Sequence, residues 1–439
     1  MSILIKNGLV LLRDGAGWKT ERRHIVIEGN RIAKITRRLP DAGGFRVIDA
    51  AGKLVMPGLI NAHTHAYMTL LRNCADDLPF FEWLDTVLRY EAGMTQEDVY
   101  WGTLLAAVEM IKSGTTCFVD MTIKSAQTKA GRRSAAAGAA LESGMRAVIS
   151  RGLAGVADSE ESLMKYGQAV AEMELFADEP LVSFIHGPHA PYSCCADYLR
   201  KLTQSAKERG IGQTVHLSES RTEVDACLAE HGMTPIAYVD SLGVFDVPVI
   251  AAHCVYATDD DIRIMSEKKV SVALNPKSNC KLGNGFAPAQ KFIDAGINVC
   301  LGTDGTASNN SLNMFAEMNT ASLVYKGAAL RPDAAGASEV LGMATVGGAR
   351  AIGREGELGE IRAGALADLI LVNLDCPQFC PANDIVSGLV YSSNGSEVDT
   401  VIIDGKVVME DRRLLTVDEA KVLSECEKIA RRIRKTASV

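Results

Sequence analysis

The chain has 439 residues, of which 47% are apolar and 23% are charged, and its formal net charge is −8 at pH 7. This length suits a large enzyme-sized domain with a smaller companion domain, and the composition excludes an intrinsically disordered protein. An acidic chain binds nucleic acid and anionic membranes poorly. We therefore expect a small-molecule substrate, with neither nucleic acid nor a membrane as partner, and a homo-oligomer is left open.

The beginning of the chain and its cysteines predict a cytoplasmic location. Residues 1–10 alternate like a strand, unlike a charged-then-apolar leader, and no apolar run is long enough to cross a bilayer. Eleven cysteines without a framework spacing suit reduced thiols. We interpret Cys194, Cys195, Cys376 and Cys380 as packing residues, because no nearby histidine or cysteine completes a set of metal ligands.

Residues 1–57 are predicted to form short strands. Glycine and asparagine turn signals separate three β-rich segments, SILIKNGLVLL, HIVIEGNRIAKI and FRVIDAAGKLVM. A similar pattern of short β-rich segments occurs in residues 356–439, where Asp404-Gly405 marks a hairpin turn. We expect the two chain ends to build one small β-sandwich domain together.

A helix is predicted to close the chain from Val417 onward. Its apolar stripe consists of Val422, Cys426, Ile429 and Ile433. The basic run ARRIRK within it is interpreted as a solvated helix face, because the protein as a whole is acidic.

Residues 58–355 are predicted to alternate strands with helices. Thr95 is a plausible cap for the helix that follows it. The apolar runs are TCFVDM, RAVIS, LVSFIHG, GQTVHLS, VPVIAAHC, VSVALNP and INVCLGTD. This regularity indicates a parallel sheet with crossover helices, and the number of runs favours an eight-stranded α/β barrel over an open sheet. A dinucleotide-binding fold is disfavoured because its glycine fingerprint is absent.

His63 and His65 carry the first chemical signal. Alternation along a strand directs both imidazoles to one face, where they can bind the same metal ion. The pair alone is equally compatible with polar residues at a strand end. His216 and Asp304 also end apolar runs, although separately they suit a core histidine and a turn residue. Together the four supply three nitrogens and one oxygen, a ligand set for one divalent metal, zinc first and iron next.

Two further residues follow the same rule of position. Glu219 lies three residues after His216, and His253 ends another apolar run. In a parallel barrel these strand ends meet at one mouth, where active sites form. Glu219 would reach a substrate held over the metal, and His253 would hold or deprotonate a water there. The structural alternatives are a solvated surface glutamate and a buried histidine bonded to the backbone.

Several motifs carry a resemblance over essentially the whole chain. They are PGLINAHTH, LLRNCADDLPFFEWL, GPHAPYSC, HLSES, AHCV, NPKSNCKLGNG, LGTDGTASNNSLNMF and ADLILVNLD. With these motifs the chain resembles the amidohydrolase superfamily and, within it, the methylthioadenosine/S-adenosylhomocysteine deaminases. The resemblance implies a distorted (β/α)8 TIM-type barrel with one metal bound by His63, His65, His216 and Asp304. No lysine ends a strand to bridge a second metal.

The resemblance also implies roles for the remaining site residues. Glu219 would protonate N1 of an adenine ring, while His253 and Asp304 would take the proton from water. The substrate-binding residues would be Glu219 itself, Glu91 at the ribose hydroxyls, Arg151 at the 5′ substituent, His189 at the purine ring and Ser308 in the pocket wall. The expected reaction is hydrolytic deamination of 5′-methylthioadenosine, S-adenosylhomocysteine, adenosine or 5′-deoxyadenosine.

Residues 121–138 depart from the family pattern, because no aromatic residue follows the Asp-Met pair. Lys124, Arg132 and Arg133 either contact an acidic substituent of the substrate or form a solvated basic loop. One alternative function is therefore an amidohydrolase for another aminated or halogenated heterocycle, such as guanine, a pterin or an s-triazine. The other is a non-catalytic binding protein, although such relatives typically lose metal ligands and this chain retains all four.

Overall fold

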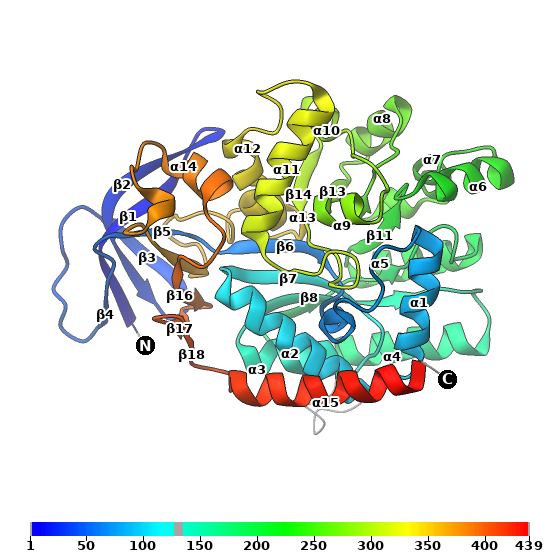
Figure 1. Cartoon of the computed structure of the whole chain (residues 1–439), viewed down its shortest axis with the longest axis horizontal. Coiled ribbons are helices and arrows are strands. Elements are labelled where there is room, and N and C mark those ends of the chain that lie inside the picture. Colours follow the sequence, from blue (N-terminus) through cyan, green and yellow to red (C-terminus); the bar gives the residue numbers. More distant parts are fainter. Residues whose placement is uncertain (1, 127–134, 438–439) are drawn as a thin grey trace.

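The computed structural model describes residues 2–126 and 135–437. The two chain ends combine in one sheet of nine strands, seen beside the rest of the molecule in Figure 1. Its strands are β1 (Ser2–Asp14), β2 (Gly17–Glu28), β3 (Arg31–Thr36), β4 (Arg46–Asp49), β5 (Lys53–Pro57), β15 (Leu369–Asn373), β16 (Val398–Ile403), β17 (Lys406–Glu410) and β18 (Arg413–Leu414). The predicted small β domain from both chain ends is confirmed.

The join between the chain ends is the antiparallel pair β5 and β15. Leu369 lies opposite Pro57, and the pairing continues to Asn373 opposite Lys53. Isoleucine, leucine and valine from both ends share one buried cluster that includes Ile3, Ile27 and Leu371. The hairpin between β16 and β17 turns at Asp404-Gly405, where both residues have positive φ, as the sequence predicted.

The remaining strands are parallel and form the barrel. They are β6 (Leu59–Thr64), β7 (Thr115–Thr122), β8 (Arg146–Leu153), β9 (Val182–Phe184), β10 (Gly187–Pro188), β11 (Gln213–Leu217), β12 (Val249–His253), β13 (Ser271–Leu274) and β14 (Asn298–Leu301). Segments β9 and β10 both pair with β8 and act as one interrupted strand, which leaves eight strand positions.

Contacts at both edges close the two parallel sheets into a barrel. A parallel bridge between His186 and Gln213 joins the sheet of β6 to β10 with the sheet of β11 to β14. On the other side, the Asp304 amide donates to the His63 carbonyl at 3.0 Å. Because parallel strands point the same way, their carboxyl ends gather at one mouth of the barrel.

Helices follow most of the barrel strands. They are α1 (Phe80–Ala92), α2 (Gln96–Lys112), α3 (Ala135–Ser143), α4 (Glu160–Leu175), α5 (Ala196–Arg209), α6 (Arg221–His231), α7 (Pro235–Ser241), α8 (Asp259–Glu267), α9 (Pro276–Lys281), α10 (Ala289–Asp294), α11 (Met314–Ala329), α12 (Ala337–Gly342), α13 (Gly348–Ala351), α14 (Ile385–Ser387) and α15 (Glu419–Ala437). Thr95 begins α2 with a capping box that Asp98 completes, which confirms the predicted cap.

The C-terminal helix α15 lies along α2 (Figure 1). Val422, Cys426 and Ile433 of the predicted stripe are buried there. Within the basic run, Arg432 forms an ion pair with Asp98 at the beginning of α2. We propose domain boundaries near residues 57 and 355, where the chain passes between the sheet and the barrel.

All eleven cysteines are free thiols. Among the helices of the described residues, none combines the length and the apolar character needed to span a bilayer. The cytoplasmic location stays a prediction.

Buried ion pairs fasten the barrel to the chain-end sheet. Arg146 of β8 bonds to both carboxylate oxygens of Asp368, at 2.9 and 3.1 Å, and to Asp404 at 3.2 Å. The Arg146 side chain is only 5% exposed. Burial opposes the charge of Arg146, but Asp368 and Asp404 raise its pKa above the usual range. The guanidinium therefore stays charged between the two domains.

Replacing Arg146 by alanine is expected to lower the free energy of unfolding by about 3–5 kcal/mol, because the buried Asp368 and the half-buried Asp404 lose their partner. Urea unfolding followed by circular dichroism measures the loss. The control is Arg350→Ala, which removes an exposed pair with Glu355 and should cost at most about 1 kcal/mol. Equal losses in the two variants would contradict a fastening role for Arg146.

Candidate metal-dependent active site

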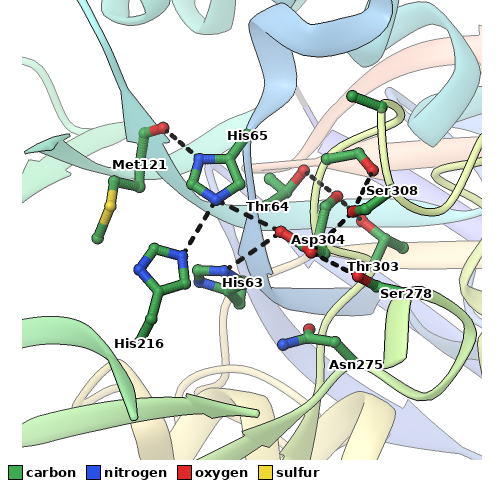
Figure 2. A network of polar contacts seen from close by, with 12 residues as sticks. His63, Thr64, His65, Met121, His216, Asn275, Ser278, Thr303, Asp304 and Ser308 are labelled. Atoms are coloured by element: carbon green, nitrogen blue, oxygen red, sulfur yellow. Dashed lines mark hydrogen bonds and ion pairs between the residues drawn. The ribbon is translucent and has the colours of Figure 1, made fainter. Parts of the chain in front are cut away.

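Strand ends at one mouth bring the four predicted metal ligands together. His63 belongs to β6, His65 follows it, His216 belongs to β11 and Asp304 follows β14. Figure 2 shows the three imidazoles and the carboxylate turned toward one another. Nε2 of His65 lies 3.2 Å from Nε2 of His216 and 3.4 Å from Oδ1 of Asp304, and Nε2 of His63 lies 3.6 Å from the same Oδ1.

The proton positions on these imidazoles favour a cation between them. Nδ1 of His65 lies 2.8 Å from the Met121 carbonyl, and Nδ1 of His216 lies 2.7 Å from the His189 carbonyl. Carbonyl oxygens only accept, so each Nδ1 carries a proton, and burial keeps His216 neutral by lowering its pKa. In the neutral form of each ring the lone pair then lies on Nε2, and the two Nε2 atoms face each other.

A divalent metal ion between the Nε2 atoms of His65 and His216 would explain their close approach. Ligands of a tetrahedral zinc ion, each about 2.0–2.1 Å from the metal, stand about 3.3 Å from one another, close to the spacings observed here. His63 is buried, and neither of its ring nitrogens has a hydrogen-bond partner among the described residues. Three imidazole nitrogens and one carboxylate oxygen thus fit one metal ion of borderline softness.

The Asp304 carboxylate is held from behind. The hydroxyls of Ser278 and Ser308 lie 2.6 and 2.8 Å from its Oδ2, which leaves Oδ1 toward the histidines. Burial would raise the pKa of Asp304, but the three neighbouring imidazoles of His63, His253 and His65 together hold it well below the usual range. Asp304 is therefore an anion.

Glycine after Asp304 leaves room for the Met68 side chain beside the metal ligands. A Cβ atom at Gly305 would lie 2.2 Å from the Met68 sulfur and 3.2 Å from the Cβ of His65. The turn-forming Asp-Gly pair of the sequence thus also allows Asp304 to approach the first two ligands.

Glu219 and His253 form an acid and a base beside the ligand cluster. Glu219 is 4% exposed, and burial together with the charges of Asp304 and Glu223 raises its pKa well above the usual range. Its Oε1 accepts from Asn284 at 3.1 Å, and its Oε2 lies 3.7 Å from Nε2 of His253. Glu219 therefore carries a proton near neutral pH.

His253 has the opposite protonation state. Its Nδ1 donates to Oδ1 of Asn279 at 2.9 Å, and burial lowers its pKa to about 4. Its Nε2 consequently presents a lone pair, and no hydrogen-bond partner for it exists among the described residues. A proton donor and a proton acceptor thus stand side by side.

A cavity of about 550 Å³ opens over these groups. This volume suits a small molecule. The lining includes most of the predicted residues and an aromatic and aliphatic wall from α1: His65, His216, Asp304, Glu219, His253, Glu91, Arg151, His189, Phe80, Phe81, Trp83 and Leu84. Ser308 does not line the cavity; it is fully buried and contacts Asp304. Its place in the pocket wall is corrected to a place behind the metal ligand.

The predicted substrate contacts Glu91, Arg151 and His189 line the same cavity. Glu91 accepts from the Tyr67 hydroxyl, and burial raises its pKa. Arg151 is 7% exposed, and its Nε and Nη1 have no partner among the described residues. His189 bonds to Ser193 at 2.8 Å, and burial lowers its pKa to about 4.

Other residues of the site were missed or are not described. Tyr67 gave no sequence signal, whereas Ser278, Asn279 and Asn284 belong to the motif NPKSNCKLGNG without an assigned role. In the divergent segment 121–138, Lys124 lines the cavity, and Lys165 of α4 lines it too. The predicted contacts of Arg132 and Arg133 lie outside the described residues.

Comparison with known proteins identifies the family. The sequence model of the amidohydrolase family matches residues 54–408. The chain belongs to the amidohydrolase family. This membership confirms the resemblance seen in the motifs, and the barrel with a second sheet confirms the predicted fold class.

Three relatives of this amidohydrolase cover nearly its whole length. A 5-methylthioadenosine/S-adenosylhomocysteine deaminase of Caldanaerobacter subterraneus is 45% identical over 438 residues, which is 99% of each chain. A 5′-deoxyadenosine deaminase of Methanosarcina mazei is 42% identical over 98% of this chain and 97% of its own. The crystal structure of an adenosine deaminase from Xanthomonas campestris with bound zinc superposes with a TM-score of 0.90, at 32% identity, over 99% and 98% of the two chains.

Proposed function

We propose that this amidohydrolase deaminates an adenine nucleoside or its 5′-thioether derivative, releasing ammonia and the inosine analogue. The observation that carries the proposal is the buried Glu219 carboxyl 3.7 Å from Nε2 of the buried His253, beside the four-ligand cluster. Deamination needs both groups, since the ring must gain a proton and water must lose one. The deaminase names of three relatives support the same reaction.

The ligand set and the zinc-bound relative support zinc as the metal, with iron second. When bound by His63, His65, His216 and Asp304, the metal supplies Lewis-acid activation of a water molecule. In the proposed reaction, His253 and Asp304 accept the proton of the attacking water. Its oxygen bonds to the ring carbon that bears the amine.

Glu219 acts on the adenine ring, at the nitrogen next to the carbon that water attacks. Its carboxyl donates a proton to N1, which draws electrons from the reacting carbon and makes the attack easier. The bond from carbon to the amine nitrogen then breaks: the nitrogen takes the proton that His253 and Asp304 accepted and leaves as ammonia, and the proton of the new hydroxyl restores Glu219. Nucleobase deaminases of another fold use a glutamate in the same way.

The rest of the cavity suits a nucleoside. We propose that Glu91 accepts from the ribose hydroxyls, that His189 bonds to the purine and that Arg151 meets the 5′ substituent. Nε and Nη1 of Arg151 have no hydrogen-bond partner among the described residues, so a ligand that accepts from them would satisfy two buried donors.

Ammonia release on a substrate panel tests the proposal. The panel comprises adenosine, 5′-deoxyadenosine, methylthioadenosine, S-adenosylhomocysteine, guanine and melamine, each assayed with zinc-loaded protein. We expect one of the first four to give the highest kcat/KM. A clear preference for guanine or melamine would replace the nucleoside with another heterocycle, and no turnover of any compound would favour the non-catalytic alternative.

Replacing Glu91 by alanine is expected to lower kcat/KM for the best nucleoside by about 10- to 100-fold, because one or two charge-assisted hydrogen bonds to the ribose are lost. Steady-state kinetics measure the change. The control is Glu82→Ala, an exposed glutamate on the same helix, which should leave kcat/KM unchanged. If Glu91→Ala equals the control, the substrate is not a nucleoside.

A further inference from the structure

A fully buried carboxylate that the reaction does not use lies beneath the metal ligands. Glu317 stands in the first turn of α11 and is 0% exposed. Its Oε1 accepts from the side-chain amide of Asn309, and its Oε2 accepts from the backbone amide of Lys277 at 3.4 Å. Asn309 belongs to the loop after β14, whereas Lys277 lies at the beginning of α9, the helix after β13.

The first contact closes the loop that carries Asp304. The Asn309 side-chain amide has two N–H groups, and the second donates to the Thr303 carbonyl at 2.6 Å. The bond from Glu317 thus fixes an amide that spans the loop from Thr303 to Asn309. Between these residues lie Asp304 and Ser308, whose hydroxyl contacts the Asp304 carboxylate. Thr303 and Ser308 appear beside Asp304 in Figure 2.

The second contact fixes the beginning of α9. Lys277 is followed by Ser278, whose hydroxyl lies 2.6 Å from Oδ2 of Asp304. Next comes Asn279, which accepts from Nδ1 of His253 at 2.9 Å. The same short helix therefore holds both the metal ligand and the base. Through its two oxygens, Glu317 connects this helix to the loop of Asp304.

We propose that Glu317 is a positioning residue that sets the Asp304 carboxylate and the His253 imidazole relative to each other. Glu317 is not one of the described residues that line the cavity, so it acts through Asn309 and Lys277. One carboxyl oxygen accepts from the Asn309 side chain in the loop of Asp304, and the other accepts from the Lys277 amide at the beginning of α9. The activity readout of this inference rests on the proposed function, whereas its metal-affinity readout does not.

The test replaces Glu317 by glutamine, which keeps the size of the side chain but turns one acceptor into a donor. Groups that orient metal ligands typically contribute about 10- to 100-fold to metal affinity or activity. We therefore expect zinc affinity, measured by chelator competition without substrate, to fall about 10-fold or more. We also expect kcat to fall about 10- to 100-fold with KM within about threefold.

The matched control is Glu397→Gln. Glu397 is also buried, at 6% exposed, but its carboxylate accepts from Ser393 in the segment before β16. Zinc affinity and kcat of the control should stay within about threefold of the unmodified protein. If both variants lost zinc affinity and kcat equally, the effect of Glu317→Gln would come from a general loss of stability. That result would overturn the proposal.

A double-mutant cycle with Asn309→Ala separates the proposed route from other causes. Because the two residues share one bond and each keeps one other contact, the loss of zinc affinity in the double variant should be smaller than the product of the two single losses. Losses that multiply would overturn the proposal.

If Glu317→Gln fails to fold, Asn309→Ala alone decides, because unchanged zinc affinity and kcat in that variant would also overturn it. A wrong substrate class would alter the kinetic readout and leave the zinc readout intact.

Discussion

Replacing Glu219 by glutamine is expected to lower kcat by about 10²-fold or more, which is the usual contribution of a general acid or base. The variant keeps the size of the side chain and the acceptor for Asn284, but it has no proton to give to N1. Because the metal ligands are unchanged, zinc content should stay at one per chain. Steady-state kinetics and metal analysis of the same preparation measure the two quantities.

The dependence on pH adds a second signature of Glu219. An acid that must be protonated supports turnover below its pKa and loses it as pH rises through that value. Since burial and nearby carboxylates raise the pKa of Glu219 well above the usual range, Glu219 should impose a fall of kcat on the alkaline side, and Glu219→Gln should lack that limb. Glu230→Gln on the exposed face of α6 serves as control. Near-normal kcat in Glu219→Gln would exclude the proposed role.

Replacing Asp304 by asparagine is expected to remove both metal and activity. The substitution keeps the shape but loses the one negative charge of the ligand set. We expect less than about half a zinc per chain after dialysis. We also expect kcat to fall by at least about 10³-fold, because a bound metal contributes several kcal/mol to the transition state and each 1.36 kcal/mol is tenfold.

Zinc analysis and ammonia release measure the effect of Asp304→Asn. The control is Asp261→Asn, which alters another buried carboxylate, one that caps α8 through Thr258. It should keep zinc and most of kcat while losing some stability. Chelation of the unmodified protein should reproduce the loss of activity, and added zinc should restore it. Full zinc content and kcat in Asp304→Asn would remove Asp304 from the metal site.

The sequence predicted the ligand cluster because its members obey one positional rule. His63, His216 and His253 lie at the carboxyl ends of apolar runs, and Asp304 lies just beyond another. In a parallel barrel those ends meet, so positions far apart in the chain become neighbours without any knowledge of individual contacts. Chain-end strands were also predictable, since alternating apolar residues and an Asp-Gly turn report on local geometry.

The residues that support the site did not follow such a rule. Tyr67 reaches Glu91 from a short 3-10 helix, and Glu317 reaches Asn309 from the helix after the loop. Ser308 was expected to line the cavity, but its loop turns the hydroxyl toward Asp304. These outcomes depend on side-chain direction and loop path, which hydrophobic periodicity does not encode.

The pairing of β5 with β15 has a consequence for synthesis on the ribosome. β5 ends at Pro57, but its partner begins at Leu369, roughly 300 residues later. Translation proceeds at about 5–20 residues per second, so about 15–60 s pass between the synthesis of β5 and the synthesis of β15, which completes the sheet. During that interval the edge of β5 is open to incorrect strand pairing, so chaperone demand during translation should be concentrated on the earliest part of the chain.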